Sequence, residues 1–206
     1  MNKQQTISKP VSLKGVGIHS GNEVNLTFKP ANEDFGYAFC RTDLPGKPII
    51  EADVNYVVST ERGTTLEKNG VNIQTSEHVL AALTGLEIDN VLIEIDASEP
   101  PIMDGSSKFF VEALIDAGIE EQSKDRNEYV VKEIISYHDE ESGSDITVLP
   151  ADSYEVTAMV DFGTKILGTQ NATMKRLSQF KDEFADARTF SFLHEIEMLL
   201  ENGLIK

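Results

Sequence analysis

The sequence is poor in cysteine and in basic residues, and it has no long hydrophobic run. The single cysteine, Cys40, excludes an internal disulfide framework and is typical of a reducing cytoplasm, where we expect the protein. We interpret Cys40 as a small buried or half-buried strand residue. No apolar stretch approaches the roughly 18 to 20 residues that a membrane helix needs, so we expect no transmembrane segment. The polar residues 1–5 lead into no signal-peptide core.

Basic residues number 18 against 35 acidic ones, which gives a net charge of −17. Such a surface repels phosphate backbones, so we do not expect nucleic-acid binding. A phosphorylated substrate would need a local basic patch. The 206 residues, 40% of them hydrophobic, suffice for one sizeable core or two small ones.

The first half of the chain alternates between strand and helix patterns. Strands are expected at 24–28, 37–41 and 90–95, and the glycine-rich segment 15–21 is expected to be a tight turn between strands. A dinucleotide loop does not fit that segment, because no helical pattern follows it. Ser76 is a plausible N-cap of a first helix, and Gly118 ends a second one. The apolar faces of these two helices are Val79, Leu80, Leu83 and Leu86, and Phe110, Ala113, Leu114 and Ala117.

The polar segment 120–127 is predicted to be a linker, after which the strand patterns begin again. The following elements are predicted there: strands at 129–137, 146–149 and 154–162, a hairpin tip at 138–145, and helices around 180–187 and 191–201. Strands followed by helices in both units indicate an α+β fold. The predicted units are residues 1–124 and 128–206, and the second is short for a domain with its own core.

The four histidines differ in what their neighbours suggest. His138 lies among acids at the hairpin tip and is expected to be a solvated surface residue. His194-Glu195 does not begin a zincin motif, because position 198 is methionine. His19, in the glycine-rich turn, either faces a cleft or is a structural turn residue.

Glu77 and His78 fall in the first turn of the first predicted helix. Adjacent helical residues point about 100° apart, so both side chains can border one cleft. An imidazole there can bind zinc while the carboxylate reaches a metal-bound water. The residues alone favour the alternative, in which Glu77 simply stabilises the helix dipole. One histidine does not hold zinc, since a catalytic site normally needs about three protein ligands.

A set of motifs resembles the zinc-dependent UDP-3-O-acyl-N-acetylglucosamine deacetylases, in the family's order and spacing from about Thr6 to the last residue. Taken together the motifs are specific, although each one alone is weak. The matching segments are 75–83 (TSEHVLAAL), 89–91 (DNV), 101–106 (PIMDGS), 15–21 (GVGIHSG), 41–44 (RTDL) and 187–190 (ARTF).

The resemblance implies an enzyme that removes the N-acetyl group of a UDP-linked, 3-O-acylated glucosamine, the committed step of lipid A synthesis in Gram-negative bacteria. It also implies two similar layered α+β domains, each a sheet packed with two helices, the second incomplete in this chain. Glu77 matches the general base, His78 the first zinc ligand and Thr189 the oxyanion-stabilising hydroxyl. Residues expected to bind substrate are Asp161, Phe162, Phe190 and His19. Asp104, before Gly-Ser, is interpreted as a structural turn residue.

The sequence departs from the family at two places. Ser191 stands where many members have glycine, and the His-Lys-x-x-x-Asp helix that carries the other zinc ligands does not occur. We therefore expect the remaining Zn²⁺ ligands beyond residue 206. A hydroxyacyl carrier-protein dehydratase, fused to this deacetylase in some bacteria, would also lie outside the chain. The alternative is a non-catalytic fragment or binding module that retains the fold.

Overall fold

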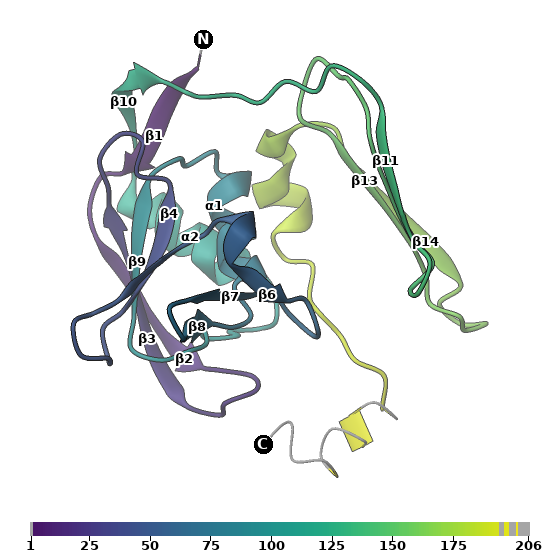
Figure 1. Cartoon of the computed structure of the whole chain (residues 1–206), viewed down its shortest axis with the longest axis horizontal. Coiled ribbons are helices and arrows are strands. Elements are labelled where there is room, and N and C mark those ends of the chain that lie inside the picture. Colours follow the sequence, from purple (N-terminus) through teal and green to yellow (C-terminus); the bar gives the residue numbers. More distant parts are fainter. Residues whose placement is uncertain (1, 194–195, 198–200, 202–206) are drawn as a thin grey trace.

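The computed structural model describes residues 2–193, 196–197 and 201, and its fold is α+β, as the sequence predicts. Figure 1 shows a body formed by the first part of the chain and an arm of hairpins that extends from it. No helix in the described residues is long and apolar enough to cross a membrane. The central sheet contains β2 (Val11–Val16), β3 (Glu23–Pro30), β4 (Tyr37–Arg41), β5 (Ile49–Glu51) and β9 (Val91–Ile95).

The central sheet runs in the order β2-β3-β9-β4-β5, and only the β4–β9 pair is parallel. Alternate side chains of β3 and β9 point into the core. The apolar residues of β3 accordingly recur every second position, whereas β9 is a nearly continuous apolar run. The expected turn does join β2 to β3, but it covers residues 17–22, because Gly15 and Val16 belong to β2. Cys40 lies in β4 and is buried, as predicted.

Two helices cover the core: α1 (Glu77–Gly85) and α2 (Lys108–Ala117). The predicted face of α1 is confirmed, because Val79 and Leu83 are fully buried while Leu80 and Leu86 pack partly buried against the same cluster. The α2 ring of Phe110 meets Phe28 edge-on at a centroid distance of 6.4 Å. This contact packs α2 against the central sheet.

Smaller elements complete the body. A three-stranded sheet contains β6 (Val57–Ser59), β7 (Thr65–Lys68) and β8 (Val71–Ile73), and the 3-10 helix η1 (Val54–Tyr56) precedes it. A separate antiparallel ribbon pairs β1 (Lys3–Ile7) with β10 (Ile119–Asp125). The prediction of a linker from residue 120 is therefore wrong as far as Asp125, since those residues form a strand.

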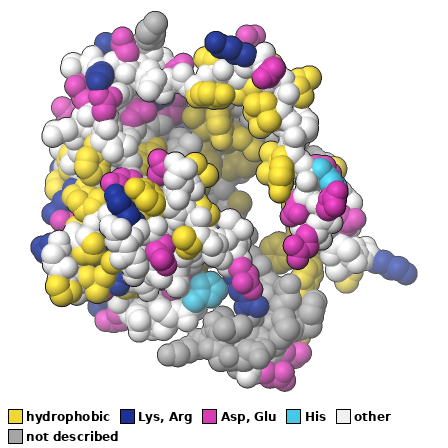
Figure 2. All heavy atoms as spheres, viewed as in Figure 1, with side chains coloured by type: hydrophobic (Ala, Val, Ile, Leu, Met, Phe, Trp, Pro, Cys, Tyr) yellow, Lys and Arg dark blue, Asp and Glu magenta, His cyan; other side chains and the backbone are white. Residues whose placement is uncertain are grey.

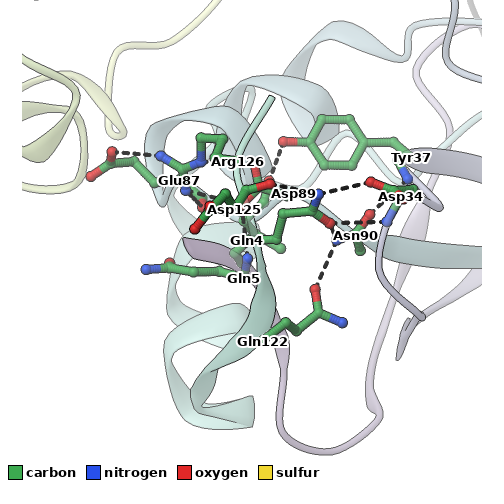
Figure 3. A network of polar contacts seen from close by, with 12 residues as sticks. Gln4, Gln5, Asp34, Tyr37, Glu87, Asp89, Asn90, Gln122, Asp125 and Arg126 are labelled. Carbon is green, nitrogen blue, oxygen red and sulfur yellow. Dashed lines mark hydrogen bonds and ion pairs between the residues drawn. The ribbon is translucent and has the colours of Figure 1, made fainter. Parts of the chain in front are cut away.

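Polar residues of this segment, Gln122 and Arg126 among them, take part in a partly buried hydrogen-bond network (Figure 3). The Asn90 amide donates to Gln4 Oε1 and to Gln122 Oε1, both at 2.8 Å. Beyond β10, Arg126 donates to the Glu87 carbonyl oxygen at 2.6 Å and pairs with the Asp89 carboxylate. β10 is thus held by backbone pairing with β1 and by side-chain amides, and it lacks the apolar alternation that identifies most strands. The contacts of Arg126 anchor the chain to the body as far as residue 126.

The arm consists of two separate hairpins. They are β11 (Ile135–Asp139) with β12 (Ser144–Val148), and β13 (Val156–Asp161) with β14 (Thr169–Met174). Residues 129–134 lie outside regular structure, so the strand predicted at 129–137 begins too early, and β14 was not predicted at all. His138 is exposed and its Nδ1 lies 2.8 Å from Asp145 Oδ1 across the hairpin.

A short helical segment follows the arm and packs against α1 (Figure 1). It consists of the 3-10 helix η2 (Leu177–Gln179) and the π-helix η3 (Phe180–Phe184), in place of the helix predicted around 180–187. Residues 193, 196, 197 and 201 are helical, in agreement with the last predicted helix. His194, Leu199, Leu200 and Gly203 lie outside the described residues.

Candidate active site

The carboxylate of Glu77 lies at the first turn of α1 and faces the loop before β7. Its Oε2 accepts a hydrogen bond of 2.8 Å from the Thr64 amide. Ser76 does precede the helix, but it makes no capping bond; its hydroxyl donates instead to the Thr64 carbonyl oxygen at 3.0 Å. A Cβ added to Gly63 would stand 3.1 Å from Glu77 Oε1, so glycine keeps the space over the carboxylate open.

A cavity of about 300 Å³ opens at this loop. His19, from the glycine-rich turn, lines one side of it, which favours the first of the two interpretations that the sequence left open for this residue. Arg62 supplies a cation and Glu61 an anion at the same cavity. The lining residues are His19, Glu61, Arg62, Gly63, Thr65, Gln74 and Thr75.

His78 and Thr189 are both attached to the turn that precedes α2. The Ser107 hydroxyl donates to the His78 carbonyl oxygen at 2.9 Å, and the Thr189 amide donates to the Gly105 carbonyl oxygen at 2.8 Å. The structure thus brings Thr189, which lies more than 100 residues later in the sequence, to the end of α1 that carries His78.

Asp104 holds this turn together, as its interpretation as a structural residue implies. Its carboxylate accepts hydrogen bonds from the Ser106 amide and hydroxyl, and Arg188 forms an ion pair with it at 2.9 Å. The Ser106 hydroxyl, and after it the Arg188 guanidinium, hold the pKa of Asp104 below its usual value. Arg188 thereby fixes the backbone next to Thr189.

Phe190 joins the candidate site to the end of β13. Its ring lies 5.2 Å from that of Phe162 and 5.6 Å from that of Phe192, in tilted and edge-on arrangements. Asp161 precedes Phe162 and accepts a hydrogen bond from the Gly163 amide. The structure therefore places Phe162 and Phe190 together, with Asp161 beside them. His19, the remaining residue expected to bind substrate, lines the cavity at the loop before β7.

The described residues contain no group of three or more His, Cys, Asp or Glu side chains arranged to hold a metal ion. His78 offers one imidazole, whereas a catalytic zinc normally has about three protein ligands. The described donor set therefore does not form a complete zinc site. What the described contacts do bring together is the backbone of Glu77, His78 and Thr189 near one end of α1. The side chains of these residues are a carboxylate, an imidazole and a hydroxyl, types that hydrolases use to activate water and stabilise an oxyanion.

The chain belongs to the UDP-3-O-acyl N-acetylglycosamine deacetylase (LpxC) family, whose sequence profile matches residues 4–206. It is 46% identical, over 98% of its length, to the bifunctional enzyme LpxC/FabZ of Chlorobaculum tepidum, and covers 44% of that protein. Its identity to the bifunctional enzyme LpxC/FabZ of Bacteroides thetaiotaomicron is 44%, over 100% of the chain and 45% of the relative. The UDP-3-O-acyl-N-acetylglucosamine deacetylase of Geotalea uraniireducens is 42% identical, over 98% of the chain and 65% of the relative. The chain thus spans less than half of the two bifunctional relatives.

Three features of the site were not predicted from the sequence. The loop that carries Arg62 and Gly63 has no distinctive pattern before its contact with Glu77 is known. Arg188 lies inside a family motif, but nothing in that motif indicates its pairing with Asp104. Glu99 stands before Pro100-Pro101, where an acid is expected in an exposed turn, yet its side chain is completely buried.

Proposed function

We propose that a protein of its relatives' length that contains this chain hydrolyses the N-acetyl amide of UDP-3-O-acyl-N-acetylglucosamine in the cytoplasm, the committed step of lipid A synthesis in Gram-negative bacteria. The observation that carries the proposal is the placement of Glu77, His78 and Thr189 at one end of α1, in a chain of the deacetylase family. Three relatives that bear this activity in their names are 39–42% identical to the chain.

Glu77 takes a proton from the attacking water in this proposal. The water oxygen bonds to the acetyl carbon, the Thr189 hydroxyl donates to the oxyanion that develops, and the carbon–nitrogen bond then breaks as the amine takes up a proton. The Thr64 amide fixes the direction of the Glu77 carboxylate, and the Gly105 contact fixes the backbone of Thr189. Both groups are thus held by neighbours before substrate arrives.

We further propose that His78 is one ligand of a Zn²⁺ ion and that the other ligands come from residues outside the described part of the protein. A bound zinc ion lowers the pKa of a water molecule to about 7 and polarises a carbonyl group. His78 suits this role because imidazole is a common zinc ligand and because the backbone of His78 is anchored to Ser107.

The substrate is proposed to lie between two sets of residues. The paired rings of Phe162 and Phe190 provide an apolar surface for a flat or acyl group, with Asp161 at its edge. On the other side His19 borders the cavity near Glu77, where Arg62 partly offsets the acidic character of the chain. A hydroxyacyl carrier-protein dehydratase is a proposed fused or associated partner, because three relatives are named bifunctional enzyme LpxC/FabZ.

Acetate release from UDP-3-O-acyl-N-acetylglucosamine tests the function in the protein of full relative length. Glu77→Gln is expected to lower kcat by about 10²- to 10⁴-fold, because the general base is lost. Thr189→Val is expected to lower kcat by about 10²-fold, because one oxyanion donor is lost. The matched control is Glu112→Gln, an exposed carboxylate on α2 that pairs with Lys108, and it should leave kcat unchanged. Full activity of Glu77→Gln would refute the assignment.

Zinc binding by the 206-residue chain tests the ligand assignment separately. Because the described residues contain no group of three ligands that could hold a metal ion, the chain by itself should bind zinc weakly and should not release acetate. Isothermal titration with zinc, compared between the chain and its His78→Ala variant, measures the contribution of that ring. Tight one-to-one binding that persists in His78→Ala would mean that the ion sits elsewhere.

The alternative is a non-catalytic module that keeps the fold for binding. The absence of a three-ligand group among the described residues favours it. A protein of full relative length that binds the UDP-sugar but releases no acetate, with zinc present, would support this alternative over the deacetylase.

A further inference from the structure

Glu99 is a fully buried carboxylate in the turn between β9 and α2, with 0% of its surface exposed. A carboxylate withdrawn from water needs several hydrogen-bond donors, because the lost hydration must be replaced. The described donors come from two other segments. One is the glycine-rich turn that carries His19, and the other is Thr75, two residues before Glu77.

The glycine-rich turn contributes two backbone amides. His19 N lies 3.1 Å from Oε1 and 3.2 Å from Oε2 of Glu99, and Ser20 N lies 2.9 Å from Oε2. Thr75 adds its hydroxyl, which donates to Oε1 at 3.3 Å. One side chain thus joins three segments that lie far apart in the sequence.

Gly17 makes this approach possible. A Cβ at position 17 would stand 2.4 Å from Glu99 Oε2, which is closer than any side-chain carbon can lie. The same Cβ would stand 2.4 Å from Ser20 Oγ, so the buried carboxylate and the turn itself both require glycine at position 17. Thr75 itself adopts a positive φ of 53°, an unusual conformation for a β-branched residue, and its contact with Glu99 helps to maintain it.

We propose that Glu99 is a positioning residue that fixes the His19 turn against the segment leading into Glu77, and so sets the shape of the cavity between them. His19 and Thr75 both line that cavity of about 300 Å³, while Glu99 acts from behind them. The proposal rests on the proposed function, since the cavity is taken to receive the acylated UDP-sugar. Glu99 has no role in the chemical step.

Glu99→Gln tests this in the protein of full relative length. The amide keeps the size of the side chain but turns an NH₂ group toward backbone N–H donors, so one arm of the contact is lost. We expect KM for the UDP-sugar to rise by about tenfold while kcat changes by less than about threefold, because binding rather than transition-state chemistry is impaired. Glu99→Asp, which keeps the charge but is one methylene shorter, should give a smaller rise in KM.

The matched control is Glu33→Gln. Glu33 also accepts from two backbone amides and a hydroxyl, those of Ser123 and Lys124, but it lies at the β1–β10 ribbon. Glu33→Gln should leave KM for the UDP-sugar unchanged. His19→Ala combined with Glu99→Gln should raise KM no more than the larger single change, because both act through one turn. Additive effects, or a Glu99→Gln protein with normal KM and reduced stability only, would overturn the proposal.

A second readout separates this proposal from the deacetylase assignment. In nuclear magnetic resonance spectra of the 206-residue chain, the His19 and Ser20 amide protons should shift on Glu99→Gln substitution, while the Thr64 amide, bound to Glu77, should not. Absence of the shifts would disprove the contact whatever the activity. A wild-type protein without deacetylase activity would reject the proposed function, and the amide shifts would still report on the contact.

Discussion

Tyr37 of β4 is a partly buried polar side chain whose ionisation can be followed. Its hydroxyl donates to the Ile88 carbonyl oxygen, just beyond α1. Burial, with a smaller contribution from the negative charge of Asp89, raises the pKa of Tyr37 to about 12. The folded chain therefore favours the neutral phenol over the phenolate.

Tyr37 is expected to make the chain lose stability in alkali. Its folded pKa of about 12 exceeds the ordinary tyrosine value of about 10, so its contribution is complete below pH 10 and is lost as the pH rises toward 12. Tyr37→Phe should lower the free energy of unfolding by about 1 kcal/mol at neutral pH, because the Ile88 carbonyl loses its donor. Urea unfolding at several pH values measures both effects. An unchanged alkaline slope in Tyr37→Phe would assign the loss to other groups.

The residues of the candidate site differ in how far the sequence alone identifies them. Glu77 and His78 are adjacent at a helix start, so local periodicity places them at one end of α1. Thr189 was expected only through the family resemblance, because its contact with Gly105 joins segments far apart in the chain. Glu99 carries no local signal, since only its contacts with the His19 turn and Thr75 distinguish it from an exposed turn acid.

At the scale of elements, the pattern of apolar residues decided which strands could be predicted. β3 alternates and β9 is a nearly continuous apolar run, and both were found, whereas β10 is polar on both faces and was taken for a linker. β14, with the sequence TQNATM, was missed because it lacks an apolar pattern of its own. It forms a strand through its antiparallel pairing with β13. The register and the partner of a strand depend on segments that are distant in the sequence, so a local pattern does not predict them. The expected division into two domains remains a prediction from composition and resemblance.

The contact between α1 and the segment η2–η3 depends on one glycine. A Cβ at Gly85 would stand 2.1 Å from Cδ1 of Phe180, so the ring of Phe180 occupies the place of a side chain. The segment that follows Phe180 leads to Thr189. The end of α1 opposite to His78 thus receives the helical segment that carries the chain back to the site.

Gly85→Ala should lower the free energy of unfolding by about 1–3 kcal/mol, because the new methyl group overlaps the Phe180 ring. In a Phe180→Ala background the same change should be neutral or stabilising by up to about 1 kcal/mol, since alanine is the better helix residue. Urea unfolding of the four proteins completes a double-mutant cycle. Equal effects in both backgrounds would show that the ring does not lie against Gly85.

On the scale of the whole molecule, the arm exposes apolar surface that the body does not cover. In the β11–β12 hairpin the cross-strand pairs Ile135–Val148 and Tyr137–Ile146 share one face, while Ser136–Thr147 lies on the other. All four apolar side chains are at least 40% exposed. Figure 2 shows hydrophobic side chains along this arm, beside the gap that separates it from the body. A contiguous apolar strand surface of this kind favours association.

The 206-residue chain is therefore expected to self-associate through this face, against the repulsion of its net charge of −17. Raising the salt concentration beyond about 0.1 M, where the Debye length falls below about 10 Å, should strengthen association because the repulsion is screened. Ile146→Lys, on the apolar face, should weaken self-association about tenfold, whereas Thr147→Lys adds the same charge on the polar face and should act only through net charge. Sedimentation velocity at low and high salt distinguishes the two variants. Equal behaviour of both would show that charge, and not the apolar face of the hairpin, controls the contact between copies.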